Sequence, residues 1–185
     1  MKKLAIVLIV LILALSVSLC ACQAKVNTQP TKTAVVYFSI TGNTETIANY
    51  IAEIKGADVF EIEAKIPYTP EDLAYEDNTN RSSLEQADDT SRPEMAKAID
   101  LSEYATVYIG YPIWHGIAPR IIYTFFESQT FGWKHVIPFC TSAESPVGES
   151  VTLLKNLNRG GHWEDGIRFA ENAPKADIEA WLATI

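Results

Sequence analysis

Short apolar runs alternate along this chain with segments of helical periodicity, and the alternation limits the possible folds more than any other feature. The continuous apolar runs indicate strands that are buried on both faces, whereas the helical segments carry apolar residues on one side. Strands separated by helices pair in parallel through right-handed crossovers. We therefore predict an α/β domain in which helices cover both faces of a parallel sheet. Strands are expected at 34–38, 57–64, 106–112, 135–140 and 166–170, and helices at 44–56, 91–102, 118–128, 148–157 and 174–184.

Proline has a bearing on two of these elements. Ser91 and Glu94 stand at the spacing of a capping box, and Pro93 would lie in the first turn of the predicted helix 91–102. Pro138 is unusual within the predicted strand 135–140, because proline removes a hydrogen-bond donor from the ladder.

Length and charge narrow the class of protein. The 185 residues leave room for one folded domain of about 150 residues. The net charge of -8 argues against nucleic-acid binding, which requires clustered lysine and arginine. Seven acidic residues stand against one arginine between Thr69 and Thr90. This acidic segment, 69–90, is either a solvated loop face or a docking patch for a basic partner.

The N-terminus resembles the signal of an exported lipoprotein. A lysine pair precedes the apolar run 4–19, and the sequence LCAC follows it. A small residue before Cys22 favours cleavage there and attachment of lipid to its thiol; Cys20 is a weaker candidate, because the bulky Leu19 precedes it. An uncleaved anchor helix is the alternative, since the run is about as long as a membrane span. The predicted organisation is a signal peptide at 1–21, a polar tether at 22–33 and a folded domain at 34–185, held outside the cytoplasm on a membrane.

Cysteine and histidine offer little metal or disulfide chemistry. Only Cys140 remains in the folded part once the signal is removed, so no internal disulfide is possible there. His115, His135 and His162 are scattered without the spacing of a ligand set. We expect no metal site.

The stretch SITGNT, residues 39–44, follows the first strand and leads into a helix. Unpaired N–H groups at a helix start, together with the hydroxyls of Ser39, Thr41 and Thr44, can surround a phosphate. The stretch contains neither a G-K-[ST] sequence nor a G-x-G-x-x-G sequence, so a P-loop and a dinucleotide fingerprint are excluded. A simple strand-to-helix turn would have the same composition.

Two further strand-end loops have compositions suited to a ligand. The segment GYPIWHGIAP, 110–119, places Trp114 where a loop should be polar, either as a ring for stacking or as a cover for the core. The segment TSAESPVGES, 141–150, again combines hydroxyls with a glycine, although a helix cap would have a similar composition. In open parallel sheets, ligands bind beyond the carboxyl ends of the strands, where these three loops would meet.

The three motifs VVYFSITGNTETIA, GYPIWHGIAP and IPFCTSAESPVGES together resemble the flavodoxin family, specifically its small flavodoxin-like branch, over nearly all of 34–184. The resemblance implies a flavodoxin-like, doubly wound, five-stranded parallel sheet of order 2-1-3-4-5 and non-covalently bound FMN. The phosphate loop would be formed by Ser39, Thr41, Gly42, Asn43 and Thr44. The loops beside the isoalloxazine ring would comprise Pro112, Ile113, Trp114 and His115, and Thr141, Ser142, Ala143, Glu144, Ser145 and Gly148.

The resemblance implies electron transfer, because FMN supplies the redox chemistry and the protein sets its environment. No residues form a recognisable set of nucleophile, base and orienting group, so no catalytic residue is assigned. Ala143 and Glu144 depart from the small residues usual in similar sequences, which places a carboxylate near the predicted flavin. We expect a lipid-anchored electron carrier whose redox partners the sequence does not name. The alternatives are an FMN-dependent NAD(P)H:quinone-type reductase and a flavin-free binding module of the same fold.

Overall fold

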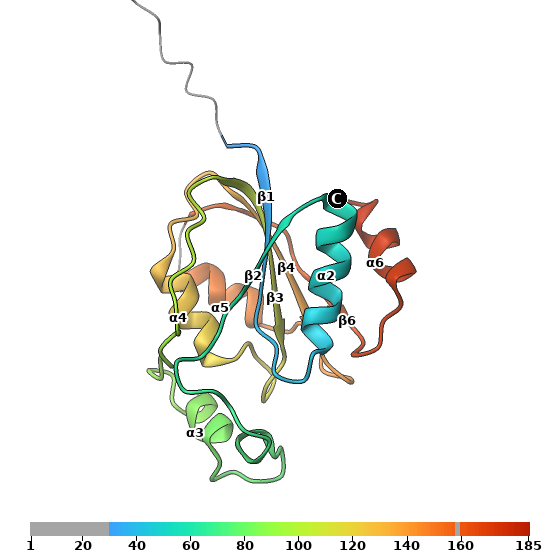
Figure 1. Ribbon diagram of the computed structural model, residues 1–185. Helices are drawn as coiled ribbons and strands as arrows, with labels where there is room; N and C mark the ends of the chain where they lie inside the picture. The colour runs from blue at the N-terminus through green and yellow to red at the C-terminus, as the bar shows by residue number, and fades with distance from the viewer. Residues whose placement is uncertain (1–29, 158–159) are drawn as a thin grey trace, which may run out of the picture.

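The computed structural model describes residues 30–157 and 160–185, and within them a single parallel sheet carries the fold (Figure 1). The strand order is β2-β1-β3-β4-β5, and β6 also pairs with β4. Every strand pair is parallel, which confirms the predicted α/β class and the order 2-1-3-4-5. The strands are β1 (Lys32–Tyr37), β2 (Asp58–Glu61), β3 (Tyr104–Pro112), β4 (His135–Thr141), β5 (His162–Trp163) and β6 (Ile167–Phe169).

Helices cover both faces of the sheet. On one face lie α2 (Asn43–Lys55) and α6 (Lys175–Leu182), and on the other lie α4 (Arg120–Ser128) and α5 (Ser150–Leu157) (Figure 1). Successive residues of a strand point to opposite faces, so Val35 packs with α2 and α6, whereas Val36 packs with α4 and α5. The result is two cores, one on each side of β1, β3 and β4.

The predicted strand at 166–170 corresponds to β6, and a further short strand that was not predicted, β5, precedes it on the same side of β4. The carbonyls of Lys134 and Val136 accept hydrogen bonds from this side, from His162 and Glu164. By the same alternation, the ring nitrogen of Pro138 faces this side and has no proton to donate. The neighbouring strand contains one extra residue at this point, because His135 pairs with His162 but Phe139 pairs with Ile167. The proline therefore coincides with the break between β5 and β6.

The predicted helix at 91–102 is wrong. This segment contains no helix and is bridged to the chain beyond β2 at Ala64 and Met95, with Lys65 N–H donating to Glu94 O at 2.8 Å. Its apolar residues Ile99 and Leu101 are buried in the core beneath α4. Tertiary pairing and burial therefore override the capping-box pattern.

The acidic segment contains helices that the sequence reading did not assign. A short 3-10 helix, η2 (Glu71–Leu73), precedes α3 (Arg81–Ala87). Asn80 caps α3, because its side-chain oxygen accepts the Ser83 N–H at 2.9 Å. In Figure 1 this segment lies below the sheet, at the edge where the parallel strands end.

The two ends of the parallel strands therefore have different surroundings. The amino ends of the strands lie at one pole, where β1 begins at Lys32, and their carboxyl ends lie at the opposite pole, beside α3 (Figure 1). The predicted signal peptide, Cys22 and most of the tether lie outside the described residues. Over 30–157 and 160–185, no helix combines the length and apolar character that crossing a membrane requires.

Candidate functional site

The first predicted loop, residues 39–44, makes a tight turn between β1 and α2. Gly42 occupies the N-cap position of α2 with a left-handed φ of 87°, a conformation that glycine adopts without strain. Its N–H donates to Ser39 Oγ at 3.1 Å. The N–H groups in the first turn of a helix have no partner within the helix, so this loop presents donors at the carboxyl pole.

A buried hydroxyl pair connects the first loop to the third. Thr44 Oγ1 and Thr141 Oγ1 are hydrogen-bonded at 2.7 Å, and the two residues are 1% and 2% exposed. Thr44 lies in the first turn of α2 and Thr141 ends β4, so the contact spans the intervening strand β3. Two hydroxyls share one hydrogen bond here, which leaves one hydroxyl proton for another acceptor.

The second predicted loop follows β3 and folds into a hairpin turn. Trp114 and Ile117 exchange backbone hydrogen bonds of 2.9 and 3.2 Å across His115 and Gly116. Both central residues have positive φ, 48° and 87°, as a type I′ turn requires. Ile113 N–H also donates to Thr141 O at 3.0 Å, which fixes the start of this loop against the end of β4.

Trp114 is half-buried, and its indole packs edge-to-face against two aromatic rings. The ring centroids lie 5.4 Å from Phe38 and 5.2 Å from Tyr68. Of the two roles expected for this side chain, the structure shows that it covers the core at this edge. Stacking of the indole on a ligand stays a prediction.

The third predicted loop is held by a residue that the sequence reading did not single out. Arg168, in β6, donates from Nε to Ser142 Oγ at 3.1 Å and from Nη2 to Ser142 O at 2.8 Å. A further hydrogen bond joins Nη2 to Ala143 O. Ser142 is buried, whereas Ala143, Glu144 and Ser145 are exposed. No motif marks this arginine, because its role depends on the pairing of β6 with β4.

The second and third loops lie against each other. Gly148 has a left-handed φ of 54°, and a side chain at this position would place its Cβ 3.5 Å from Gly116 O. The structure thus brings all three predicted loops to one edge of the sheet. The hydrogen bonds of Thr141, at the end of β4, reach both other loops.

The acidic segment braces the second loop, a contact that sequence reasoning missed. Gln86 donates from Nε2 to Trp114 O at 2.9 Å and to Ala118 O at 3.2 Å, while its Oε1 accepts the Arg120 N–H at 3.1 Å. Ser83 Oγ lies 3.2 Å from His115 Nε2. On the other side, the Tyr75 ring stacks on the imidazole of His115 with a centroid distance of 5.2 Å.

Tyr68 joins the acidic segment to the core at the same edge. It is 7% exposed, and its hydroxyl donates to Glu85 Oε2 at 2.6 Å. The Arg81 guanidinium covers its ring at 3.8 Å. Burial raises the pKa of the Tyr68 hydroxyl, and the hydrogen bond to Glu85 raises it further. The phenol therefore stays protonated and keeps this hydrogen bond at neutral pH.

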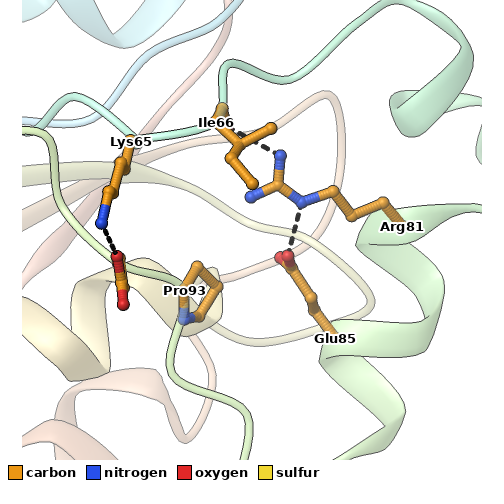
Figure 2. A pocket seen from close by; sticks show the side chains of 6 residues that line it. Lys65, Ile66, Arg81, Glu85 and Pro93 are labelled. Carbon is orange, nitrogen blue, oxygen red and sulfur yellow. Dashed lines mark hydrogen bonds and ion pairs between the residues drawn. The ribbon is translucent and has the colours of Figure 1, made fainter.

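A cavity of about 490 Å³ lies beside α3, away from the three loops. Its charged side chains form two ion pairs, Lys65 with Glu94 at 2.5 Å and Arg81 with Glu85 at 2.7 Å, on different sides of the cavity (Figure 2). Arg81 Nη1 also donates to Ile66 O at 2.8 Å. None of the lining residues belongs to the predicted loops. This cavity is thus separate from the candidate site.

The described part of the chain contains one cysteine, which forms no disulfide. Cys140 is fully buried, and burial raises the pKa of its thiol to about 12. No group of three or more histidine, cysteine or acidic side chains there is placed to hold a metal ion.

Comparisons with known proteins agree with this geometry. The family model described as flavodoxin matches residues 32–185. A candidate flavoprotein from Bacteroides uniformis is 39% identical with a TM-score of 0.79, over 83% of this chain and 99% of that one. A candidate flavoprotein from Bacteroides eggerthii is 38% identical with a TM-score of 0.77, over 84% and 98%.

A more distant structure shows the same fold. It is a Lactobacillus acidophilus flavoprotein in complex with FMN, 22% identical with a TM-score of 0.58, over 82% of this chain and 99% of that one. No curated protein matches the chain.

Proposed function

Because the chain belongs to the flavodoxin family, we propose that it binds FMN non-covalently at the carboxyl edge of its sheet and transfers electrons. The observation that carries the proposal is the junction at Thr141, where hydrogen bonds join the first, second and third loops. Ligands of open parallel sheets bind at such an edge. The FMN complex of the Lactobacillus acidophilus protein, which shares this fold, agrees with this choice of cofactor.

The first loop fits the phosphate of FMN. Ser39 Oγ accepts the Gly42 N–H, so its own proton remains available to a phosphate oxygen. The exposed Thr41 and the first N–H groups of α2, at Asn43 and Thr44, add further donors. The donor set contains no lysine or arginine, which suits a single terminal phosphate better than a longer phosphate chain.

The second and third loops would flank the flavin ring. FMN would supply the electron chemistry, and these loops would orient the ring and limit its contact with water. The brace from Gln86 to Trp114 O would keep the second loop in one position. Ser83 Oγ and His115 Nε2 lie 3.2 Å apart at this edge, but no carboxylate among the described residues forms an ion pair with that imidazole to orient it, so a role in carrying electrons is favoured over a hydrolytic or transfer reaction.

We further propose that a lipid on Cys22 holds the protein at a membrane surface outside the cytoplasm. The observation that supports this is the sequence LCAC after an apolar run. Cys22→Ser should abolish labelling by a fatty-acid analogue, whereas Cys20→Ser should leave labelling intact. The reverse pattern would move the lipid to Cys20, and labelling of neither variant would favour an uncleaved helix.

The cofactor proposal is tested by comparing FMN with riboflavin on the flavin-depleted protein. Hydrogen bonds to a charged phosphate contribute about 1.5–3 kcal/mol each, so FMN should bind at least tenfold more tightly. Thr41→Val should weaken FMN but not riboflavin, and the exposed Thr152 of α5 provides the matched control, Thr152→Val. Equal affinities for FMN and riboflavin would remove the phosphate role from residues 39–44.

The electron-transfer proposal has a separate test. An electron carrier should oxidise NADH and NADPH only slowly by itself, yet be reduced rapidly once a suitable reductase is added. Stopped-flow absorbance of the flavin follows both reactions. Rapid direct oxidation of either nucleotide, with turnover on a quinone, would instead show the reductase.

A further inference from the structure

Arg168 places a cation directly behind the third loop. Its guanidinium binds the hydroxyl and the carbonyl of Ser142 and the carbonyl of Ala143. The residue stands in β6 opposite Cys140 of β4, so a strand pair rather than a flexible loop fixes its position. A planar fork of donors suits two neighbouring carbonyls, which a lysine could not bind in the same way.

The positive charge of Arg168 is not cancelled by an ion pair. The ion pairs formed within 30–157 and 160–185 involve other cations, and no carboxylate in these ranges lies within 4.0 Å of this guanidinium. The side chain is half-buried. Its field therefore acts on neighbouring groups in a partly dry environment, where electrostatic interactions are stronger than in water.

The carbonyls that Arg168 binds belong to peptide groups whose N–H ends point the other way. Ser142 O shares its peptide with the Ala143 N–H, and Ala143 O shares its peptide with the Glu144 N–H. A cation on each carbonyl polarises the peptide and strengthens its N–H as a donor. Ala143 and Glu144 are exposed on the loop predicted to contact the flavin ring.

We propose that Arg168 is a positioning residue that makes the 142–144 turn stabilise the negative charge which a bound flavin gains on reduction. The inference rests on the FMN binding proposed above. Full reduction takes up two electrons and one proton and leaves the flavin with one additional negative charge. Charge beside the flavin ring is one of the means by which a protein sets the reduction potential.

Glu144 places a negative charge near the predicted flavin, and its effect on the reduction potential should be opposite to that of Arg168. Its carboxylate stands on the same turn, is exposed, and opposes the cation. The turn thus carries a solvent-exposed carboxylate and is bound from behind by a cation, which three hydrogen bonds fix in place. Removing one charge or the other should move the reduction potential in opposite directions.

The test is the two-electron midpoint potential of the purified, FMN-loaded protein, measured against a reference dye with dithionite as reductant. Arg168→Gln removes the charge and keeps a donor, and should weaken binding of the reduced flavin about tenfold more than that of the oxidised flavin. A tenfold increase in the ratio of the Kd of reduced flavin to the Kd of oxidised flavin lowers the potential by about 30 mV. Arg168→Lys should shift the ratio about threefold, and Glu144→Gln should raise the potential.

Arg92→Gln is the matched control, because Arg92 pairs with Glu127 and contacts none of the three loops. Its potential should equal that of the parent. If Arg168→Gln lowers the affinity for oxidised FMN but leaves the potential unchanged, Arg168 is a structural clamp and the inference is overturned. If Arg168→Gln does not fold, an unchanged potential in both Arg168→Lys and Glu144→Gln overturns it equally. A parent protein that binds no FMN would overturn the proposed function, a different result from a bound flavin with an unchanged potential.

Discussion

Gly110 lies near the carboxyl end of β3 and contacts the ring of Phe139 on β4, its partner in the sheet register. A Cβ added at Gly110 would lie 2.2, 2.5 and 2.9 Å from three ring atoms of Phe139. Carbon atoms in good contact are about 3.5–4.0 Å apart, so the ring would have to move by more than about 1 Å. Phe139 is fully buried, and a packed core resists such a shift.

We therefore expect Gly110→Ala to lower the free energy of unfolding by about 3 kcal/mol, at the upper end of the cost of overpacking. The measurement is urea unfolding followed by tryptophan fluorescence. A smaller partner should relieve the clash, so Gly110→Ala should cost at least 1 kcal/mol less in a Phe139→Leu background, the size of coupling seen between contacting residues.

Gly132 provides the control for this cycle. It has a φ of 51° and open space around it, so Gly132→Ala should cost only the strain of a left-handed backbone, about 1–2 kcal/mol. That cost should be the same with Phe139 or Leu at position 139. If the Gly110 and Phe139 substitutions are strictly additive, the contact does not limit this position and the reasoning is refuted.

Three further predictions concern titration, the acidic segment and the buried thiol. Burial and the nearby Glu63 and Glu45 raise the pKa of Glu61 from its usual 4.5. The folded state therefore loses stability as the pH rises above that value. In thermal melts, Glu61→Gln should raise Tm by about 1–2 °C at pH 7 and by less at pH 4. Arg120 Nε donates to Glu85 O and Nη2 to Gln86 O, so Arg120→Met should cost about 1–3 kcal/mol and speed amide exchange in α3 more than in β3. Burial raises the pKa of Cys140 to about 12, so a thiol reagent at pH 8 should modify Cys140 only after denaturation.

The sheet could be predicted from the sequence because its central strands are continuous apolar runs. β1, β3 and β4 are buried on both faces, which leaves little other use for such segments. Local rules failed where tertiary contacts decide the structure. The segment 91–102 has the pattern of a helix start, yet its backbone pairs with the chain at 63–65 and its apolar residues enter the core.

The helix α3 was missed for the opposite reason. Its one large apolar residue, Leu84, is 58% exposed, so its sequence contains no amphipathic pattern. Hydrogen bonds between Arg120 of α4 and Gln86 of α3 hold this helix in place. The sequence alone does not show such contacts between distant residues. Arg168 escaped notice likewise, because a single arginine in a three-residue strand forms no motif.

The three loops of the candidate site could be placed because each directly follows a predicted strand. Parallel strands end at one edge, so strand assignment alone brought 39–44, 112–115 and 141–148 together. The hydrogen bonds that join them, such as that between Thr44 and Thr141, depend on side-chain geometry that the sequence does not specify. The assignment of individual residues to FMN stays a prediction.

The start of β1 and the candidate site lie at opposite poles of the domain (Figure 1), and this affects which partners the site can reach. If Cys22 carries lipid, the nine residues before β1 reach at most about 30 Å, and the pole where β1 begins is kept close to the membrane. When the sheet stands upright on this tether, the loops at the other pole face the aqueous side, at least one strand length, about 20 Å, further out. In that orientation electrons would be exchanged with water-facing domains rather than with carriers dissolved in the lipid. Tethering both proteins to one leaflet would raise their effective concentration, so that weak docking is sufficient for frequent encounters.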